Sequence, residues 1–471
     1  RRYLTLNVRW NFAISSWSFK VKNRYTFSPL AKKIFKDIDE HHGRAFLVGG
    51  IVRDMLIYNR VDYHDVDVEV YGLSVDELEE LLANYGNVNS IGKSFGILKL
   101  DVLPNFDFAL PRTEIKTGES HQDFDVTVNQ NLDLKVAASR RDLTINALMY
   151  EIKTGKIYDF FHGQEDIEKR TLRMVSETTF IEDPLRVLRT AQFASRLDFC
   201  IETATKLMCK KMVQNKSLDK LSKERVFQEY SKLLLSQQPS IGLTFLKEIK
   251  ALWPCLDVLS KTMQRLDYHP EGDVWRHTLL VTDLAALCCH KTSNPLGFMW
   301  SALLHDIGKA TVTTKDGHAP GHNEAGVKIF NQEVKAFIPD KQLQKYIKTM
   351  IFYHMHLMNM VRNEAKDYSY FKILKGIDGI VTIEDLILIT KCDKLGRYKD
   401  EHENINRFDY VMKEKMARLS TKAQLPLVDG YDLKALGIEP SSKYSELLDW
   451  AYDLQLRGHS KAAILKMVEG R

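Results

Sequence analysis

Cysteine and long apolar runs are both scarce in this chain of 471 residues. Its six cysteines show no paired spacing beyond the adjacent Cys288 and Cys289, so neither a disulfide framework nor a zinc ribbon is indicated. No apolar run approaches the roughly 18 residues that a membrane-spanning helix needs. We therefore expect a soluble protein of a reducing compartment, the cytoplasm, with no membrane partner.

A strong excess of charge is also missing, because the net charge is only +5 at pH 7. Any nucleic-acid surface must therefore come from local clustering of Lys and Arg. The hydrophobic content of 44% and the charged content of 27% are typical of a globular protein. A single core stops growing at about 250–300 residues, so the length predicts more than one domain.

Carboxylates are absent from the first 36 residues, which contain nine Lys or Arg. This composition fits an organelle-targeting presequence, which would place the protein in an organelle matrix. It fits a disordered basic arm or a translated leader equally well. We treat residues 1–26 as a non-catalytic basic extension whose role the sequence leaves open.

The strongest pattern lies in residues 46–72. An apolar run enters a Gly49–Gly50 turn and a helix-like segment, and a second apolar-rich segment carries Asp65 and Asp67 at alternate positions. Side chains on a strand alternate between faces, so the two carboxylates point the same way. Their repulsion favours a hard divalent cation between them. The pattern predicts a magnesium site for phosphoryl transfer; a solvated acidic edge strand is the alternative.

The residues before these aspartates suit a phosphate. Glycine lets backbone N–H groups approach a phosphate closely, and Arg53 adds a charge-assisted fork. The order GG-x-V-R-D followed by D-x-D resembles the tRNA nucleotidyltransferase and bacterial poly(A) polymerase family. The resemblance implies that Asp65 and Asp67 are catalytic and hold Mg²⁺, and that Gly49, Gly50 and Arg53 bind the nucleotide.

Two further segments extend this resemblance. The string R-R-D-x-T-I-N-A-L starts at Arg140 and is similar to the second family motif, which implies nucleotide binding by Arg141 and Asp142; a helix start with surface arginines is the alternative. Residues 159–163, DFFHG, resemble the third motif, which normally ends in Gly-Gly. His162 replaces one glycine, and we expect only a local effect.

Residues 111–125 are polar and contain glycine, which favours a surface loop. In the related family the corresponding stretch is a flexible loop that helps the active site change nucleotide. The resemblance places Arg112 in this loop.

The string IEDPLRVLR, residues 181–189, predicts a helix with Asp183 as N-cap and Pro184 at its first position. Arg186 and Arg189 are three residues apart and share a helix face. A capped amphipathic helix with exposed arginines would look the same. Ser222 is expected to cap the next such helix, in which Arg225 and Glu229 would pair; residues 221–235 resemble the fifth motif, to which we assign a bracing role.

Hydrogen bonding gives the first of these helices a sharper interpretation. Cytosine and adenine both present an amino donor beside a ring-nitrogen acceptor, whereas uracil and guanine present the reverse order. A carboxylate only accepts and a guanidinium only donates, so Asp183 with Arg186 would match C and A, and unpaired buried groups would disfavour U and G. E-D-x-x-R is the base-reading motif of the related family. The resemblance therefore assigns nucleotide binding to Asp183, Arg186 and Arg189.

A second constellation consists of histidines and aspartates after residue 270. A lone histidine on an apolar helix is usually packed in a core, but imidazole and carboxylate groups are also good ligands for a divalent metal. The H…HD…D order resembles the HD superfamily of metal-dependent phosphohydrolases, an all-α fold. The resemblance implies one metal (Mn²⁺, Ni²⁺ or Mg²⁺) with four ligands and two possible additions: His277, His305, Asp306 and Asp393, with His322 and His354.

These resemblances cover nearly everything after Phe27 and imply an α+β fold. We expect a polymerase-beta-like nucleotidyltransferase head with a mixed sheet, an all-α neck and body, and an all-α HD domain. The expected bounds are 27–160 for the head, 161–260 for the neck and body, which would bind RNA and nucleotide, 261–420 for the HD domain and 421–471 for a helical tail. The tail carries scattered Lys and Arg, which a solvated helix would also show.

The implied activity is addition of C, C and A to tRNA 3′ ends from CTP and ATP without a nucleic-acid template, with no DNA partner. Hydrolysis of a phosphomonoester or a 2′,3′-cyclic phosphate is a possible accessory activity. A poly(A) polymerase or a specialised CC-adding or A-adding enzyme shares the head motifs. An HD phosphohydrolase whose head only binds RNA belongs to a different class, and a non-catalytic RNA-binding protein is the last alternative.

Overall fold

The computed structural model describes residues 27–59, 65–89, 96–116, 124–439 and 443–470. The predicted basic extension, residues 1–26, lies outside this part of the chain. The described chain divides into two compact units. The head unit ends at Lys169 and also includes Met174–Thr179, and the helical unit contains Arg170–Arg173 and all residues from Phe180. Each unit is considered by itself.

A seven-stranded mixed sheet forms the head unit, with the strand order β3-β4-β5-β2-β1-β8-β9. Strands β2 and β5 are parallel, and the other neighbouring strands are antiparallel. The strands are β1 (Arg44–Val48), β2 (Val66–Tyr71), β3 (Val88–Asn89), β4 (Ile97–Leu100), β5 (Leu103–Ala109), β8 (Met149–Glu151) and β9 (Ile157–Tyr158). The mixed sheet confirms the fold class expected for the head.

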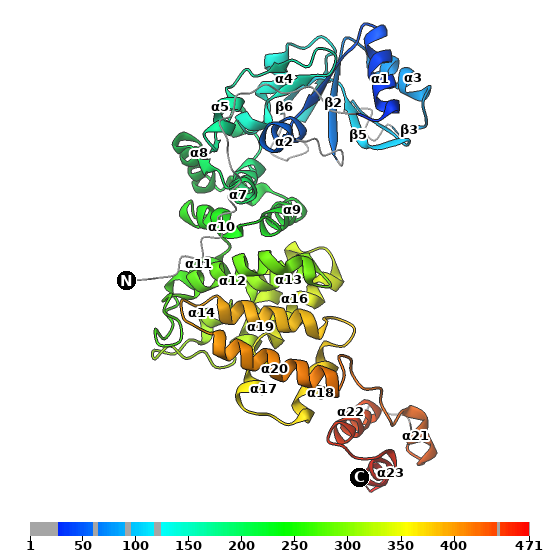
Figure 1. Ribbon diagram of the computed structural model, residues 1–471, viewed down its shortest axis with the longest axis vertical. Coiled ribbons are helices and arrows are strands. Elements are labelled where there is room, and N and C mark those ends of the chain that lie inside the picture. Colours follow the sequence, from blue (N-terminus) through cyan, green and yellow to red (C-terminus); the bar gives the residue numbers. More distant parts are fainter. Residues whose placement is uncertain (1–26, 60–64, 90–95, 117–123, 440–442, 471) are drawn as a thin grey trace. The chain divides into compact units, whose positions relative to one another are not determined.

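Helices of the head unit begin where the sequence supplies caps. Helix α3 starts after Ser74, whose hydroxyl accepts from the Glu77 amide while the Glu77 carboxylate accepts from the Ser74 amide, which together form a capping box. Figure 1 shows α3 beside α1. The helices are α1 (Pro29–Glu40), α2 (Gly50–Tyr58), α3 (Val75–Ala83), α4 (Leu134–Ser139), α5 (Gly163–Glu168) and α6 (Glu177–Phe180).

The stretch predicted as a surface loop is more regular than its composition indicates. Residues Arg112–Lys116 form β6 and pair antiparallel with β7 (Phe124–Val128) in a separate two-stranded sheet. The tip of the predicted loop, residues 117–123, lies outside the described residues. Hydrogen bonds of the strand ladder can hold a polar segment in strand geometry. Polar composition therefore does not distinguish such a strand from a surface loop.

His162 stands at the position where the third motif normally has its first glycine. It has a φ of +61° at the start of α5, a conformation that glycine adopts without steric cost. Asp159 supports the turn, because its carboxylate accepts from the Gly163 and Gln164 amides at 2.8 and 3.0 Å. A Cβ on Gly163 would lie 2.4 Å from the Thr144 carbonyl oxygen, so only the second glycine is sterically required.

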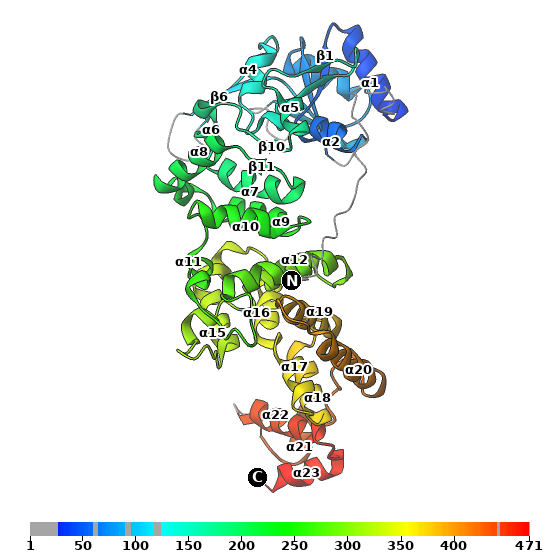
Figure 2. The same cartoon turned by 60° about the vertical axis from the view of Figure 1, so that its left-hand side comes forward.

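The described part of the helical unit is α-helical apart from a short parallel pair, β10 (Thr171–Leu172) with β11 (Cys200–Ile201), as Figure 2 also shows. The helices before residue 260 are α7 (Leu185–Leu197), α8 (Thr203–Gln214), α9 (Lys223–Leu234), α10 (Pro239–Glu248) and α11 (Pro254–Asp257). The next group is α12 (Val274–Cys288), α13 (Pro295–Leu304), α14 (Lys309–Val312), α15 (His322–Ile329), α16 (Lys341–Tyr353), α17 (His356–Arg362), α18 (Asp367–Ile377), α19 (Ile383–Leu395) and α20 (His402–Arg418).

An aromatic stack crosses the predicted boundary between the neck and the HD domain. The rings of Tyr230 and Trp253 lie 4.7 Å apart and those of Trp253 and Trp300 5.7 Å apart. The indole of Trp300 is fully buried and donates to the Ser231 hydroxyl at 3.2 Å. Burial of such rings is strongly stabilising, so helices on both sides of residue 260 share one core.

The last helices have a small core of their own. They are α21 (Gly430–Ala435), α22 (Lys443–Leu456) and α23 (Lys461–Glu469). Val428, Leu433, Ala451, Ile464 and Val468 are buried against one another. These helices lie within the segment predicted as a helical tail, and the boundaries of the four predicted parts remain predictions.

No described helix has the length and apolarity that crossing a membrane requires.

Close packing of α10 against α7 makes Gly242 sensitive to substitution. A Cβ there would lie 2.4 Å from the Ala191 carbonyl oxygen and 2.6 Å from the Ser195 hydroxyl. Overpacking of this kind costs about 1–3 kcal/mol, so G242A should lower the free energy of unfolding by that amount in a denaturant titration. G430A is the control, because the Cβ would meet nothing closer than 3.8 Å; equal stability of the two variants would contradict the packing argument.

Candidate functional site

Carboxylates gather on one face of β2 in the head unit. Asp67 is half-buried, Asp65 is exposed directly before the strand, and Glu69 is buried two residues further on. Asp107 on β5 is the register partner of Asp67 and also pairs with Lys99 at 2.8 Å. The segment in which we expected alternating carboxylates thus leads into β2, the central strand of the sheet.

Like charges around Asp67 change its acidity. Burial raises the pKa of Asp67, the negative charges of Asp65, Asp107 and Glu69 raise it further, and Arg141 lowers it. Such crowding disfavours the ionised form unless a cation is present. Carboxylate oxygens are the ligands that Mg²⁺ prefers, so the residues present fit the predicted magnesium site.

Gly49 lets the turn before α2 lie against this carboxylate. It has a φ of +74°, and a Cβ built on it would lie 3.1 Å from Arg141 Nη1 and 3.4 Å from Asp67 Oδ2. The structure therefore brings three predicted site residues together. A side chain at position 49 would strain the backbone and crowd both charged groups.

Arg53 and Asp142 belong to a neighbouring network. The buried Arg53 guanidinium donates to both Asp54 oxygens at 2.8 Å and to Asn146 Oδ1 at 2.6 Å. Asn146 in turn donates to Asp142 Oδ1 at 2.9 Å. These contacts join the first and second motifs and hold Gly50, whose added Cβ would lie 3.4 Å from Arg53 Nη2. Arg112 begins β6 and is half-buried.

The helical unit contains the predicted base-reading residues at the start of α7. The helix begins at Leu185, so Asp183 precedes it by one residue more than expected, but its carboxylate still accepts from the Leu185 amide at 3.1 Å. Asp183, Arg186 and Arg189 are all half-buried. Arg189 also lies over the Phe193 ring at 5.4 Å.

Arg225 holds Asp183 from the bracing helix α9. Its Nη2 lies 2.8 Å from Asp183 Oδ2, while Ser222 caps α9 by accepting from the Arg225 amide. The predicted pair of Arg225 with Glu229 is wrong, since Glu229 instead pairs with Lys232 at 3.0 Å. The sequence spacing favoured a contact within the helix, and the approach of α7 decided otherwise.

All six predicted metal ligands of the HD constellation converge inside the helical unit. They lie in or directly after α12, α13, α15, α16 and α19. Each is buried, and His322 is the most exposed at 9%. Three groups of His, Asp and Glu among the described residues could hold a metal ion. One group is His277, His305 and Asp393, and another is Asp306, His322 and His354.

Distances link these groups into one centre around Asp306. Asp306 Oδ2 lies 3.2 Å from His305 Nε2 and 3.7 Å from His277 Nε2, and Oδ1 lies 3.5 Å from His322 Nε2. His277 Nε2 is 2.9 Å from Asp393 Oδ1. His305 Nε2 is buried and has no hydrogen-bond partner in the described chain. An orphaned imidazole nitrogen beside two carboxylates fits a divalent metal.

Groups behind the ligands fix their ring orientation. His277 Nδ1 lies 3.0 Å from Glu271 Oε1, which also lies 2.8 Å from His269 Nδ1. His305 and His354 use Nδ1 to contact the carbonyl oxygens of Ala302 and Ile351. A donated Nδ1–H leaves the Nε2 lone pair for a metal, as in many metalloenzymes.

The two aspartates and His354 of the centre have electrostatics that match this role. Burial alone would raise the pKa of Asp306, but His305 and Lys309 hold it well below its usual value. Arg397 and His277 do the same for the pKa of Asp393. Burial lowers the pKa of His354 to about 3. Ionised carboxylates and a neutral imidazole are the states in which these groups bind metals.

The sequence analysis missed several partners of these sites because only tertiary contacts reveal them. Asp107 follows from the register of β2 with β5, and Asn146 from its bond to Arg53, although its motif had been quoted. Glu271 lies two residues from His269 in a polar turn, a pattern that carries no signal on its own. The missed residues are Asp107, Asn146, Arg225, Glu271, Lys309 and Arg397.

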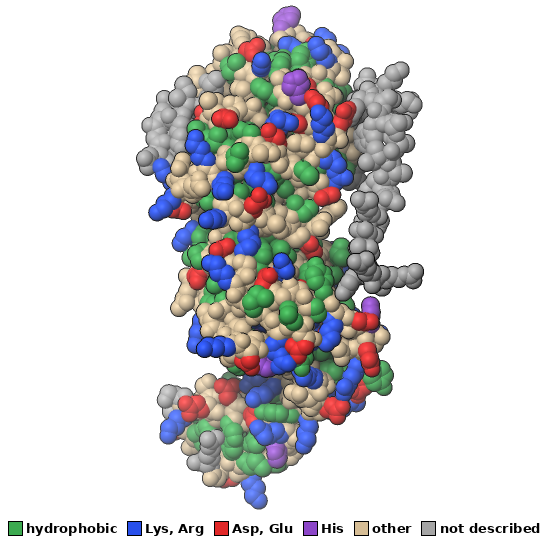
Figure 3. Space-filling view, turned by 90° about the vertical axis from the view of Figure 1, so that its left-hand side faces the viewer, with side chains coloured by type: hydrophobic (Ala, Val, Ile, Leu, Met, Phe, Trp, Pro, Cys, Tyr) green, Lys and Arg blue, Asp and Glu red, His purple; other side chains and the backbone are tan. Residues whose placement is uncertain are grey.

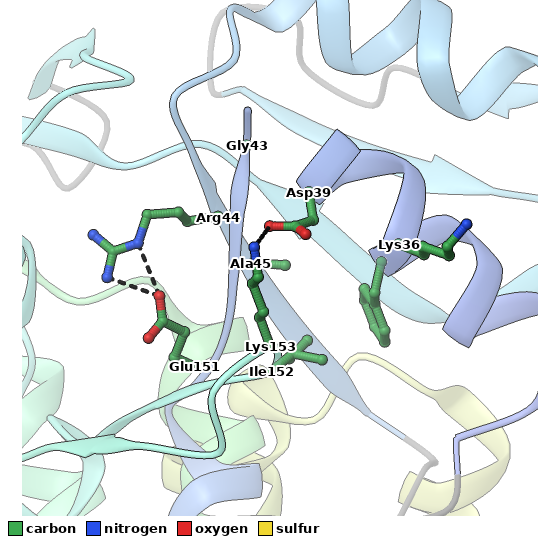
Figure 4. A pocket seen from close by; sticks show the side chains of 9 residues that line it. Lys36, Asp39, Gly43, Arg44, Ala45, Glu151, Ile152 and Lys153 are labelled. Carbon is green, nitrogen blue, oxygen red and sulfur yellow. Dashed lines mark hydrogen bonds and ion pairs between the residues drawn. The ribbon is translucent and has the colours of Figure 1, made fainter. Parts of the chain in front are cut away.

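A separate pocket in the head unit, drawn in Figure 4, is lined by Lys36, Asp39, Arg44, Glu151 and Lys153 among others. Its charges are matched internally: Arg44 pairs with Glu151 at 2.8 Å and Lys153 with Asp39 at 2.6 Å. None of the predicted site residues lines it. Matched ion pairs leave little attraction for a charged ligand, so this pocket is not favoured as the site.

Family profiles match three parts of the chain. The poly(A) polymerase head domain matches residues 45–173, the probable RNA and SrmB-binding site of polymerase A matches 198–260, and the HD domain matches 274–397. The order of these matches is the order of the expected parts.

Solved structures share the fold. The chain is similar to a CCA-adding enzyme in complex with ATP, with a TM-score of 0.59, 21% identity and 94% coverage of both chains. It is also similar to the Thermotoga maritima CCA-adding enzyme in complex with tRNA, with a TM-score of 0.57, 21% identity and coverage of 94% and 96%.

Curated relatives are closer in sequence. The chain is 33% identical over 405 residues to the multifunctional CCA protein of Pasteurella multocida, covering 83% of this chain and 93% of the relative. It is 34% identical over 395 residues to that of Aliivibrio salmonicida, covering 81% and 91%. At this identity and coverage, the chain belongs to the family of multifunctional CCA proteins, tRNA nucleotidyltransferases with an HD domain.

Proposed function

We propose that this protein adds C, C and A to the 3′ end of tRNA, using CTP and ATP and releasing pyrophosphate. The observation that carries the proposal is the meeting of Gly49, Asp67 and Arg141 beside Asp65 and Asp107 on the central strands of the head. The chain matches its relatives over almost their whole length, and these relatives are named multifunctional CCA proteins. Similar structures are described with ATP, CTP and tRNA.

Each carboxylate at β2 has a proposed role. Asp65 and Asp67 would hold Mg²⁺, with Asp107 close enough in register to complete the set; when bound, the metal makes the attacking RNA 3′-hydroxyl more acidic and offsets the charge of the leaving pyrophosphate. The chain itself orients the reactants. Gly49 leaves room for the phosphates, Arg141 supplies positive charge beside Asp67, and the Arg53 network keeps the α2 turn in place.

Selection of C and A is assigned to α7. Asp183 offers an acceptor and Arg186 a donor, the pair that cytosine and adenine match and that uracil and guanine oppose. Arg225 fixes one Asp183 oxygen at 2.8 Å, and the Leu185 amide fixes the other. A carboxylate held in this way keeps its remaining acceptor positions in one orientation, which is the requirement for reading a base edge.

The nucleic-acid partner is tRNA, with no DNA partner and a cytoplasmic site of action. The face in Figure 3 shows Lys and Arg side chains interspersed with Asp and Glu, in keeping with the small net charge. On a surface of this kind, tRNA binding depends on contacts at particular residues more than on overall charge.

Nucleotide incorporation tests the main proposal. With Mg²⁺ and both nucleotides, we expect the protein to complete tRNA transcripts that end before CCA or after CC and to leave a complete CCA end unchanged. D67N should lower kcat/KM at least about 100-fold, because metal stabilisation supplies several kcal/mol and each 1.4 kcal/mol is tenfold. Labelled CTP and ATP resolved on a sequencing gel measure both effects.

The matched control for this assay is D76N, which removes an exposed carboxylate of α3 and should leave incorporation unchanged. An unlimited adenosine tract would identify a poly(A) polymerase, and addition of CC alone or A alone a specialised enzyme. No incorporation by the wild-type protein would refute the transferase assignment.

Loss of the brace on Asp183 should reduce fidelity. In R225Q the Asp183 carboxylate loses a charged partner, so discrimination between CTP and UTP should fall about tenfold, the effect of one lost hydrogen bond to a charged group. Single-turnover incorporation with each nucleotide measures the ratio. R170Q, which removes an exposed arginine paired with Asp198, should retain it; equal loss in both variants would argue against a bracing role.

The HD centre favours a second activity, hydrolysis of a phosphomonoester or a 2′,3′-cyclic phosphate. Six buried ligands, Asp306 among them, suit Mn²⁺, Ni²⁺ or Mg²⁺, which when bound would activate the attacking water. Glu271 and Gly396 keep His277 in the tautomer that leaves Nε2 available. Lys309 offsets the charge of Asp306 at 2.7 Å.

Separate centres predict separable activities. D306N removes the carboxylate that contacts four of the ligands, so hydrolysis of 2′,3′-cyclic AMP should fall at least about 100-fold while CCA addition stays within twofold. Phosphate release and nucleotide incorporation are measured on the same preparation. H290Q, at an exposed histidine, is the control, and loss of both activities in D306N would indicate misfolding instead of a metal role.

A further inference from the structure

Two cysteines from helices far apart in the chain lie in contact inside the helical unit. Cys288 is the last residue of α12, and Cys392 lies in α19. Their Sγ atoms are 3.7 Å apart across 104 residues of sequence, and both are free thiols. The two sulfur atoms of a disulfide are about 2.05 Å apart, so an approach of about 1.7 Å would allow the bond to form.

The two thiols differ in their exposure to solvent. Cys392 is buried, whereas Cys288 is half-buried. Oxidation begins at a thiol that solvent reaches and that ionises readily. The pKa of Cys288 is lowered, mainly because its sulfur accepts a hydrogen bond from Cys392 and also because Lys291 and Lys391 lie nearby, although burial opposes this. Cys288 is therefore the thiol that meets an oxidant first, and Cys392 is the partner that resolves it.

The adjacent Cys289 is a poorer partner for Cys288. Neighbouring residues at a helix end do not face each other, and the Cys289 thiol instead donates to the Ala286 carbonyl oxygen at 3.5 Å. Burial and the nearby Cys288 raise the pKa of Cys289. Contact and reactivity therefore both favour Cys392 as the partner.

Cys392 is connected to the HD centre through its neighbours in α19. Asp393 follows it directly, and Asp393 Oδ1 lies 2.9 Å from His277 Nε2. The Cys392 carbonyl oxygen accepts from the Gly396 amide at 2.8 Å, and the Gly396 carbonyl oxygen lies 3.2 Å from His277 Nδ1. A shift of Cys392 toward Cys288 would therefore reach the partners of both nitrogens of His277.

We propose that Cys288 and Cys392 form a thiol oxidation site, at which a hydroperoxide produces a disulfide that joins α12 to α19 and disturbs the HD centre. The effect on the HD centre rests on the proposed hydrolase activity, whereas the disulfide itself does not. A disulfide of this kind is transient in a reducing compartment, because cellular thiols reduce it again.

The oxidation takes place in two balanced steps. The Cys288 thiolate attacks one oxygen of hydrogen peroxide, the O–O bond breaks, and the hydroxide that leaves takes up the proton that Cys288 had lost. Cys288 is then a sulfenic acid. The Cys392 sulfur attacks the sulfenic sulfur, the S–O bond breaks, and the leaving hydroxide takes the thiol proton to give a second water. Two thiols are oxidised, and one peroxide is reduced to two waters.

Peptide mapping tests the oxidation site in the full-length protein without relying on turnover. After a small excess of hydrogen peroxide and alkylation of the remaining thiols, mass spectrometry without reduction should find the peptide of Cys288 joined to that of Cys392, and dithiothreitol should separate them. C392S should form no such link, and dimedone should trap its Cys288 as the sulfenic acid. C289S is the matched control and should form the link as the wild type does.

Activity measurements test the effect on the HD centre. After the peroxide is removed, oxidised wild-type protein should hydrolyse 2′,3′-cyclic AMP at least about tenfold more slowly, the lower end of the loss seen when groups behind metal ligands are disturbed. Dithiothreitol should restore the rate. CCA addition should stay within twofold, and the same peroxide treatment should leave hydrolysis by C288S unchanged.

A disulfide between Cys288 and Cys289, a link between two chains, or a sulfinic acid at Cys288 without a link would overturn the oxidation site. The mapped disulfide with unchanged hydrolysis would support the site and overturn its effect on the HD centre. Reduced wild-type protein that forms the disulfide but never hydrolyses the cyclic phosphate would support the site and refute the hydrolase activity. The failures are therefore distinguishable in one set of preparations.

Discussion

Carboxylates held close together are the constraint on which both units depend. In the head, burial and three neighbouring acids raise the pKa of Asp67. In the helical unit, Asp306 and Asp393 are buried and remain ionised only because cations and imidazoles surround them. Uncompensated charges of this kind would destabilise the fold by several kcal/mol. The crowded acids of the head in particular fit a bound cation.

The two units meet this constraint in different ways. The head uses a sheet, in which alternation and register place Asp67 and Asp107 side by side on parallel strands. A glycine turn then brings the start of α2 against the acids. The helical unit uses ligands from several helices, and a layer behind them fixes each imidazole. The sheet thus places acids on neighbouring strands, whereas the converging helices give a buried centre.

Arg225 and Lys309 illustrate the importance of residues behind the site. Neither belongs to a motif that suggests ligand binding by itself, yet each contacts one carboxylate at 2.7–2.8 Å. A charge held at this distance fixes the orientation of a carboxylate. Reading of a base edge, the role proposed for Asp183, would need such fixed orientation, since a mobile carboxylate would accept from a wrong base as well as from the right one.

Local sequence determined the parts of this protein that depend on short-range chemistry. Alternation predicted one face for Asp65 and Asp67, S-x-x-E marked the start of α3, and the spacing of the arginines after Asp183 placed them on one helix face. The resemblance of ordered motifs supplied the fold class and the family. Tertiary structure alone decided which distant groups meet: Asp107 lies beside Asp67 by strand register, Arg225 reaches Asp183 by packing of α9 on α7, and Asp393 reaches His277 across 116 residues of sequence. Sequence spacing fixes contacts within one helix or strand, whereas contacts between elements depend on how their side chains pack, as the failed pairing of Arg225 with Glu229 shows.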